Sequence, residues 1–484
     1  MTPNKPRKDE QESIATLLAP DILDLLESEP SSVAAETEDM HPADLADVAE
    51  ALPRSQVPVF LAALGAQRAA SVLEYLEEEL RTGLLEEMSP EQAAKLVAAM
   101  TPDDRADTLE EIDEDVAEEI VGALPAETRA ATEKLLLYAP DSAGGLMTTE
   151  VVSVPATYSV EEALRRVREI ARGGRREAMN VVYTVDSDGT LAGVLSLREL
   201  LAAPEGARMA DVAWPEVRKV AVTADREEVA RLIAEYDLVA IPVVDEKNRV
   251  LGVVTFDDVI DVIQAEQTED VQKLGGMEAL DEPYMQIGLL AMVRKRVGWL
   301  AILLVGEMMT ATAIGYFEDR LYQVIFLVSF IPLIISAGGN SGSQGTSLII
   351  RALALHEVTL RDWWRVALRE LPTGLILGLI LATIGFLRVE LWHAISSEGL
   401  HVGALQIGAS YGEHHVYVAT TVAVAIAGVV TFGSLAGSML PFVLRKAGFD
   451  PASASAPFVA TLVDVTGIVI FFSSALVFLH GRGM

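Results

Sequence analysis

The stretch Pro457-Phe-Val-Ala-Thr-Leu-Val-Asp-Val-Thr-Gly467 places one carboxylate, Asp464, inside an apolar run. The run continues to Leu479 and is long enough to cross a bilayer as a helix. An Asp at the centre of a membrane helix costs roughly 2.5 to 3.5 kcal/mol, so it normally faces a bundle interior or a water-filled path. Asp464 therefore predicts an ion route, and the alternative is a protonated carboxyl group hydrogen-bonded to a neighbouring helix.

Net charge divides the chain into two parts. Residues 1–292 carry 25 Lys plus Arg against 60 Asp plus Glu, a net of −35, and residues 293–484 carry 12 against 11, a net of +1. The acidic part repels nucleic acid and favours cations as partners. Its first residues lack the apolar segment of a signal peptide, so we expect it to stay in the cytoplasm. The chain has no Cys, which excludes disulfides and thiolate metal sites.

Residues 41–138 repeat a short helical phrase, behind an extension over residues 1–40 that we expect to be flexible. The phrases open at His41, Ser89, Thr101 and Pro125. Ser or Thr followed by Pro is typical of a helix N-cap, and one short helix per phrase predicts a helical solenoid. The acids of this segment are typical of solvated faces, and some are candidates for binding divalent cations: Asp103, Asp104, Glu110, Glu111, Asp113, Glu114 and Asp115.

The sequence pattern predicts the same order of elements, strand, helix, strand, strand, helix, in residues 139–212 and again in residues 213–263. The first copy predicts these elements at 151–155, 160–172, 181–186 and 191–196, and the second at 217–222, 225–236, 240–245 and 250–255, with a last helix from Asp257. The order and the phrase Gly252-Val-Val-Thr-Phe-Asp-Asp258 resemble a tandem pair of cystathionine-β-synthase-type (CBS) domains.

The CBS resemblance implies a nucleotide site. In that family a Thr or Ser, with an Asp three residues later, can hold the ribose of an adenine nucleotide. Thr255 and Asp258 fit this pattern, which makes ATP a candidate ligand, whereas the first copy has Ser196 and Glu199, one methylene longer. The alternative is a dimerising sensor module that binds no nucleotide.

Residues 264–292 join the CBS pair to the membrane. The acidic run Asp261-Val-Ile-Gln-Ala-Glu-Gln-Thr-Glu-Asp270 continues helically toward Gly275. A helix in this place could transmit domain movement to a pore, and a passive linker is the other interpretation.

Residues 293–484 predict a helical membrane domain with five spans. The apolar windows lie at 297–317, 321–349, 366–388, 416–444 and 457–480. Basic residues gather before the first span, between the second and third spans, and between the fourth and fifth spans. By the positive-inside rule, this distribution predicts a cytoplasmic N-terminus and an outer C-terminus. The outer segment 389–415 holds four His, which could bind metal or simply be hydrated.

Two features interrupt ideal membrane helices. Ala337-Gly-Gly-Asn-Ser-Gly-Ser-Gln344 predicts unwound backbone, which is tolerated only beside protein or a water-filled cavity. Pro457 removes one N–H near the start of the last span. One turn before Asp464, the carbonyl of Ala460 lies on the same face, and together they offer oxygen ligands that suit a hard cation. A second intramembrane acid, Glu307, is expected to pack within the bundle.

The order of these segments resembles the MgtE family of magnesium channels. The residues that carry the resemblance are Gly338-Gly-Asn-Ser-Gly-Ser-Gln-Gly-Thr-Ser347 and the Asp464 motif, behind a helical domain and two CBS domains. The resemblance implies a homodimer in the plasma (inner) membrane, whose paired Asp464 carboxylates surround a hydrated Mg2+ together with the Ala460 carbonyl. Ala456 stands where members of the family can carry Asn. The further Mg2+ ligands that the resemblance implies are Asp225, Glu227, Asp237, Asp258, Asp261, Glu266, Glu269, Asp270 and Asp450.

The predicted function is Mg2+ uptake through a channel that cytoplasmic Mg2+ closes, without enzymatic activity. An intramembrane metalloprotease is disfavoured because His356-Glu-Val-Thr-Leu360 lacks the second His of H-E-x-x-H. Nothing matches a Walker loop either. The serious alternative is a secondary transporter that exchanges Mg2+ or another divalent cation for Na+ or H+, with Asp464 or Glu307 carrying protons.

Overall fold

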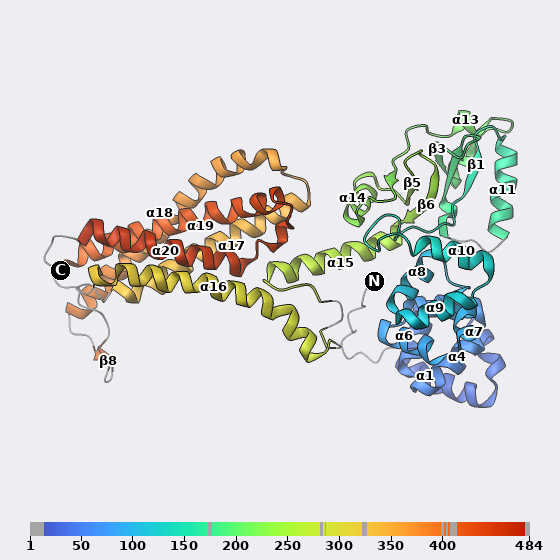
Figure 1. Ribbon diagram of the computed structural model, residues 1–484, viewed down its shortest axis with the longest axis horizontal. Helices are drawn as coiled ribbons and strands as arrows, with labels where there is room; N and C mark the ends of the chain where they lie inside the picture. The colour runs from blue at the N-terminus through green and yellow to red at the C-terminus, as the bar shows by residue number, and fades with distance from the viewer. Residues whose placement is uncertain are drawn as a thin grey trace. The chain divides into compact units, whose positions relative to one another are not determined.

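The computed structural model describes residues 14–172, 177–280, 284–285, 287–321, 327–397, 401–402, 405–406 and 414–479. The chain forms two compact units, Met1–Glu266 and Gln267–Met484 (Figure 1).

The first unit begins with a series of short helices, as the repeated phrases predict. Caps set their starts: Ser89 and Gln92 form a capping box, and Nδ1 of His41 accepts from the amide of Ala43. The helices are α1 (Ile14–Ser28), α2 (Val33–Glu36), α3 (Pro42–Ala51), α4 (Val57–Leu64), α5 (Ala66–Tyr75), α6 (Glu78–Glu87), α7 (Pro90–Val97), α8 (Pro102–Glu111), α9 (Glu114–Ala123) and α10 (Ala126–Leu135).

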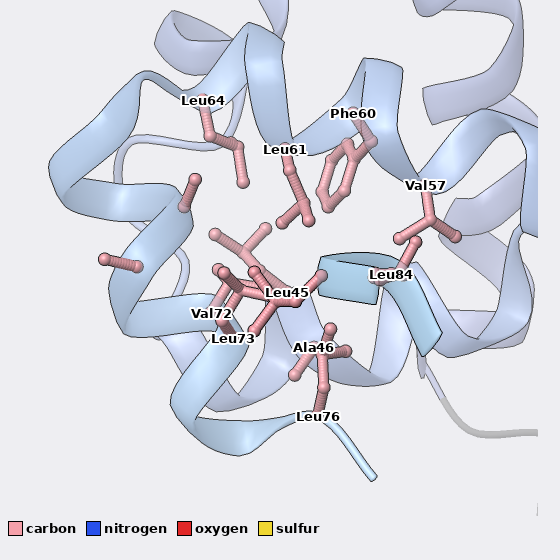
Figure 2. Packing of buried hydrophobic residues seen from close by; sticks show 14 of the residues in the cluster. Leu45, Ala46, Val57, Phe60, Leu61, Leu64, Val72, Leu73, Leu76 and Leu84 are labelled. Carbon is pink, nitrogen blue, oxygen red and sulfur yellow. The ribbon is translucent and has the colours of Figure 1, made fainter. Parts of the chain in front are cut away.

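Helices α1 to α9 bury apolar residues in a continuous core. Leu45, Phe60 and Leu73 come from three helices and are fully buried together (Figure 2). Helix α1 contributes Ile22 and Leu26 to this core. The expectation of a flexible extension is therefore wrong for residues 14–36. The apolar residues of α1 are spaced so that they share one face, and this face packs against the other helices.

Two similar three-stranded sheets follow. In each, the first strand pairs in parallel with the second, which pairs antiparallel with the third. Tyr183 and Leu191 of one copy pack with Val244 and Val253 of the other. The elements are β1 (Ser153–Pro155), α11 (Val160–Arg172), β2 (Val181–Val185), β3 (Leu191–Ser196), α12 (Leu197–Ala202), α13 (Met209–Val212), β4 (Val220–Ala221), α14 (Arg226–Tyr236), β5 (Ala240–Val244) and β6 (Val250–Thr255).

Two predicted boundaries in this region differ from the structure. The strand expected over 217–222 is only Val220–Ala221, the part that pairs with β5. The connecting helix expected over 264–292 is the second half of α15 (Phe256–Leu274), which starts directly after β6 and ends before Gly275 and Gly276. Gly276 adopts a positive φ of 76°, which a glycine accepts without strain and which ends the helix.

The second unit contains, within the described residues, five long helices: α16 (Leu289–Leu321), α17 (Ile331–Ala354), α18 (Trp363–Ser397), α19 (His415–Lys446) and α20 (Ala456–Leu479). Four helical segments are long and apolar enough to cross a membrane: Leu289–Phe317, Leu360–Ser396, His415–Lys446 and Ala456–Leu479. The remaining helix, α17, is made less apolar by its Gly- and Ser-rich middle.

That Gly-rich middle is helical, so the prediction of unwound backbone over 337–344 is wrong. Helix α17 runs without a break from Ile331 to Ala354. Its glycines lie where the backbones of α17 and α19 touch. A Cβ added to Gly433 of α19 would collide with the carbonyl oxygen of Gly338. Small residues at such crossings let membrane helices approach closely. The glycines thus serve helix packing.

Candidate cation and nucleotide sites

Asp464 lies near the middle of α20 and is half-buried, while its neighbour Val463 is fully buried in the core of the unit. The start of α20 is well fixed: Oγ of Ser455 accepts from the amide of Phe458 at 3.3 Å and from Nε1 of Trp299 at 3.0 Å. Pro457 therefore stands in the first turn, where its missing N–H is harmless. Because α20 is unbroken, the Ala460 carbonyl faces the Asp464 amide, and its second lone pair remains for a ligand.

Glu307 comes from α16 and lies close enough to Asp464 for the two carboxyl groups to interact. The two helices are in close contact one residue away, where a Cβ on Gly306 would lie 2.7 Å from Cγ2 of Thr461. Glu307 is half-buried. This agrees with the expectation that it packs within the bundle, and it brings the two carboxyl groups close together.

Asp450 precedes a short turn, Pro451–Ser453, between α19 and α20. Its Oδ1 accepts from the amide of Ala452 at 2.8 Å, and its Oδ2 lies 2.6 Å from Nζ of Lys273. The same ammonium lies 2.5 Å from Oε1 of Glu269. Two acids predicted as Mg2+ ligands are thus brought together by a lysine of α15.

The first unit gathers carboxylates from three helices. Glu74 lies in the last turn of α5, Asp104 and Asp107 lie on α8, and Asp258 and Asp261 lie on the first turns of α15. Asp257 lies beside them on α15. In addition to burial, its negative charge raises the pKa of Asp258 and that of Tyr75 at the end of α5. We call these six acids, Glu74, Asp104, Asp107, Asp257, Asp258 and Asp261, the acidic cluster.

Burial makes the charged state of the acidic cluster costly. It raises the pKa of Glu74 to about 8, with a further rise from the charge of Asp104 and an opposing effect of Arg81. Burial likewise raises the pKa of Asp258 to about 7, against the lowering effect of its hydrogen bond from Thr255. The pKa of Asp104 is raised mainly by burial too. Carboxylates whose protonation is favoured in this way gain most from a bound cation.

Burial also raises the pKa of Asp107 and of Asp261, each to about 6. Sequence reasoning missed Glu74 and Asp107 as members of this cluster. The i, i+3 spacing of Asp104 and Asp107 on one helix face was the available signal. No motif or spacing near Glu74 in the sequence indicates that it belongs to this cluster.

The other acids predicted as Mg2+ ligands lie on α14 and α15. Asp225 caps α14 by accepting from the amide of Glu227 at 2.8 Å, and Asp237 ends that helix with a positive φ of 51°. Glu266 forms an ion pair with Arg226 at 2.5 Å. Asp270 lies on α15, half-buried.

A cavity of about 200 Å³ lies between the two CBS copies, beside the predicted nucleotide residues. Oγ1 of Thr255 donates to Oδ2 of Asp258 at 2.6 Å. The cavity is lined by Asn180, Val181, Val239, Ala240, Thr255, Phe256 and Asp257. The two predicted residues therefore lie together, with Thr255 on the wall.

In the first copy Ser196 and Glu199 form a capping box at the start of α12. Nε1 of Trp214 also donates to Oε1 of Glu199 at 3.0 Å. Both oxygens of this carboxylate thus have partners within the chain.

Two His residues of segment 389–415 meet across the contact between α18, which holds His393, and α19, which begins at His415. The rings of His393 and His415 stack with centroids 4.0 Å apart, and Nδ1 of His415 lies 2.9 Å from Oε2 of Glu390. Among the described residues, no three His, Asp or Glu side chains stand in an arrangement that would hold a metal ion directly. The other two His of this segment are His401, whose side chain lies outside the described part, and His414.

Three family models match the chain in order. The MgtE intracellular N domain matches residues 40–141, the CBS domain matches 143–206 and 209–265, and the MgtE divalent cation transporter domain matches 331–474. These matches agree with the helical series, the paired sheets and the helical second unit.

Among curated proteins, the chain is similar to the magnesium transporter MgtE of Thermus thermophilus, with 43% identity over 72% of this chain and 73% of that protein. The magnesium transporter MgtE of Enterococcus faecalis is 33% identical over 72% of this chain and 71% of its own length.

Among solved structures, the soluble part of a magnesium transporter covers 52% of this chain and 99% of its own, at 30% identity and a TM-score of 0.49. The cytosolic domain of the Mg2+ channel MgtE in complex with ATP covers 51% and 99%, at 37% identity and a TM-score of 0.48. From the three family matches and the 43% identical relative, the chain belongs to the MgtE family of magnesium transporters.

Proposed function

We propose that the chain forms a homodimeric Mg2+ channel in the plasma membrane, with the carboxylate of Asp464 at the ion path. The observation that carries this proposal is the position of Asp464, half-exposed in the middle of an apolar helix. Mg2+ loses its water reluctantly and prefers oxygen ligands at octahedral positions. Two Asp464 carboxylates across a two-fold axis would bind its water shell while the Ala460 carbonyls accept from the same waters.

The membrane potential supplies the driving force. An inside-negative potential is worth about 4.6 kcal/mol per 100 mV for a divalent ion, twice the value for one charge. We place the N-terminus in the cytoplasm and the C-terminus outside, as the distribution of basic residues favours. Mg2+ then enters the cell down its gradient without a second energy source.

The acidic cluster is our candidate for the sensor that closes the channel. It contains oxygen donors only, and its buried carboxylates repel one another in the absence of a cation. Mg2+ that keeps its water shell would bind through those waters between α8 and the start of α15, relieve this repulsion and hold the two elements together. Because α15 continues into the second unit, its position is then coupled to the pore. The mechanism requires tighter Mg2+ binding to the closed state.

The test of the channel proposal is growth of a Mg2+-transport-deficient bacterium. Wild type should restore growth at low Mg2+, and Asp464→Ala should not, at equal amounts of protein in the membrane. Glu370→Gln is a matched control, since it neutralises a membrane-domain carboxylate that accepts from Ser434 at 3.1 Å. Growth with Asp464→Ala equal to wild type would reject the assignment.

One observation favours a second candidate, exchange of Mg2+ for protons. Glu307 and Asp464 lie close together, and two neighbouring carboxyl groups repel each other when both are ionised, so an exchanger would hold a proton between them when no cation is bound. An exchanger would release this proton as Mg2+ binds. Proteoliposomes separate the two functions: a channel carries Mg2+ at an imposed voltage with equal pH on both sides, and an exchanger moves protons in the opposite direction. Glu307→Gln should leave channel flux intact and abolish exchange.

We also propose that the cavity at Thr255 binds an adenine nucleotide. Its support is the cavity itself, between the CBS copies, and the hydroxyl and carboxylate that stand together at its edge. A bound nucleotide would link the two copies and thereby bias the start of α15.

A further inference from the structure

Three arginines follow one another at intervals of four residues where α18 begins. Arg361 lies in the short turn Leu360–Asp362, and Arg365 and Arg369 lie in the first two turns of α18. Residues four apart share one face of a helix, so Arg365 and Arg369 stand one above the other. All three residues are exposed. We call Arg361, Arg365 and Arg369 the arginine face.

The chain balances only part of the charge of the arginine face. Oδ1 of Asp362 lies 3.1 Å from Nη1 of Arg365, whose side chain remains 70% exposed. The other oxygen of this carboxylate accepts from the amide of Thr359 at 3.0 Å and from its hydroxyl at 2.7 Å. Within the described part of the chain, neither Arg361 nor Arg369 forms an ion pair with a carboxylate. Two guanidinium groups are therefore open to an anion from outside.

The arginine face continues along α18 as exposed aliphatic side chains. Ile376 and Ile380 follow Arg369 by seven and eleven residues, a spacing that keeps them on the same side of the helix. Both are exposed and lie within the apolar span Leu360–Ser396. The opposite side of α18 is closed by protein, since a Cβ on Gly378 would lie 2.8 Å from the carbonyl oxygen of Ala427 in α19. The open side thus has charge at one end and apolar surface along the rest.

Two tryptophans stand beside the arginines. Trp363 and Trp364 are both exposed, and the guanidinium carbon of Arg365 lies 5.5 Å from the ring centroid of Trp364. Tryptophan is enriched where lipid headgroups meet the acyl region of a membrane. The planar fork of N–H groups in a guanidinium matches the oxygens of a phosphate group. This combination fits a phospholipid whose phosphate lies at the arginines and whose chains lie along the aliphatic side chains.

Membrane topology alone does not require this arrangement. A surplus of basic residues on the cytoplasmic side sets the orientation of membrane helices, wherever around the helix those residues point. The basic residues at 294–296 of α16 are consecutive, so they point to different sides of their helix. In the arginine face, by contrast, the charges are aligned with one another and with the exposed aliphatic side chains.

We propose that the arginine face binds the headgroup of an anionic phospholipid at the cytoplasmic surface of the membrane. The phosphate accepts hydrogen bonds from the guanidinium groups, and the acyl chains lie along Ile376 and Ile380. A zwitterionic lipid binds more weakly, because its own ammonium group is repelled by the arginines. The inference goes beyond the proposed transport function and uses the proposed topology only to name the leaflet.

The experiment is a lipid titration of the full-length protein in detergent, followed by native mass spectrometry. The probes are phosphatidylglycerol, which is anionic, and phosphatidylcholine, which is zwitterionic. Wild type should bind the first phosphatidylglycerol molecule more tightly than the first phosphatidylcholine molecule. Arg361→Gln, Arg365→Gln and Arg369→Gln together should lower this preference at least about tenfold, since each basic residue near an anionic lipid strengthens binding about fivefold. Should the triple variant fail to fold, Arg369→Gln alone should lower the preference about fivefold.

A control of equal charge separates a built site from a generally basic surface. Arg294→Gln, Lys295→Gln and Arg296→Gln together remove three basic residues from α16 and should keep the wild-type preference. An equal loss in this control would show that diffuse surface charge attracts the lipid, and the inference would be overturned. It would also be overturned by a wild type that binds both lipids equally, as expected if a second copy of the chain covers this side of α18. Lipid binding is read without transport, so the result is independent of the Asp464 assignment.

Discussion

Gly437 of α19 lies so close to Gly342 of α17 that a Cβ on Gly437 would collide with the carbonyl oxygen of Gly342. Gly433 has the same relationship with Gly338 one turn away. Oγ1 of Thr346 donates to the carbonyl oxygen of Gly437 at 2.8 Å, which ties the two helices at this level. The crossing of α17 and α19 therefore rests on backbone contact and tolerates no side chain at these glycines.

Gly437→Ala should destabilise the second unit. The added methyl group meets backbone, which cannot rotate away, so we expect a loss of about 1 to 3 kcal/mol in the free energy of unfolding. Denaturant unfolding of the detergent-solubilised protein measures this. Gly428→Ala on the same helix is the control, because its Cβ would meet only Cγ2 of Ile470, at 3.1 Å, which can shift. Equal stability of the two variants would contradict the packing argument.

Nucleotide binding should depend on the cavity between the CBS copies. Val239 is 52% exposed at its wall, so Val239→Trp fills the space without removing a buried side chain. We expect ATP affinity to fall at least about tenfold, or about 1.4 kcal/mol, in calorimetric titrations. Asp188→Asn, in the exposed turn before β3, is the control. Undiminished ATP binding by Val239→Trp would place the nucleotide elsewhere or exclude it.

The metal-free protein should lose stability as pH rises. The folded pKa of Glu74, about 8, and that of Asp258, about 7, lie above the ordinary values of 4.5 and 3.8 for these side chains, mainly because the groups are buried. The folded state therefore binds more protons than the unfolded state within this window, so its stability is greatest below it and declines through it. Thermal unfolding in EDTA should show a lower midpoint at about pH 8 than at about pH 5, and Mg2+ should restore the midpoint at the higher pH.

The same experiment has a matched pair of variants. Asp104→Asn removes a charge from the acidic cluster and should flatten the pH dependence in EDTA. Asp115→Asn removes an exposed acid from α9 and should leave it unchanged. A wild-type midpoint that rises between the two pH values without Mg2+ would contradict the burial of charge in this cluster.

Local patterns were enough to predict most of the elements. Ser89 followed by Pro90 marked the start of α7, and the apolar run from Ala240 placed β5 within one residue of its observed end. Asp464 was also a local signal, since one charge within an apolar run is visible without any partner. The Gly-rich stretch was misread because glycine serves both unwinding and close approach, and only the opposite helix distinguishes them.

The partners of the candidate site residues could not be predicted in this way. Glu74 and Asp258 meet because the helical series packs against the start of α15, which no spacing within either segment encodes. Lys273 and Glu269 share one helix face and were accessible to sequence reasoning, but Asp450 joins them from 177 residues away. The same holds for Glu307 and Asp464, which come from different helices.

Neutralising acids on both halves of α15 should leave the channel open at high internal Mg2+. The variant is Asp258→Asn, Glu269→Gln and Asp270→Asn together. Asp258 belongs to the acidic cluster and Glu269 to the contact with Lys273, so predicted Mg2+ ligands on both halves of the helix lose charge. Patch recordings should show wild-type current falling as internal Mg2+ rises, whereas current through the variant persists. Neutralising Asp115, Glu118 and Glu119, three exposed acids of α9, is the control of equal charge and should preserve closure. Closure of the α15 variant at the wild-type Mg2+ concentration would show that the sensor lies elsewhere.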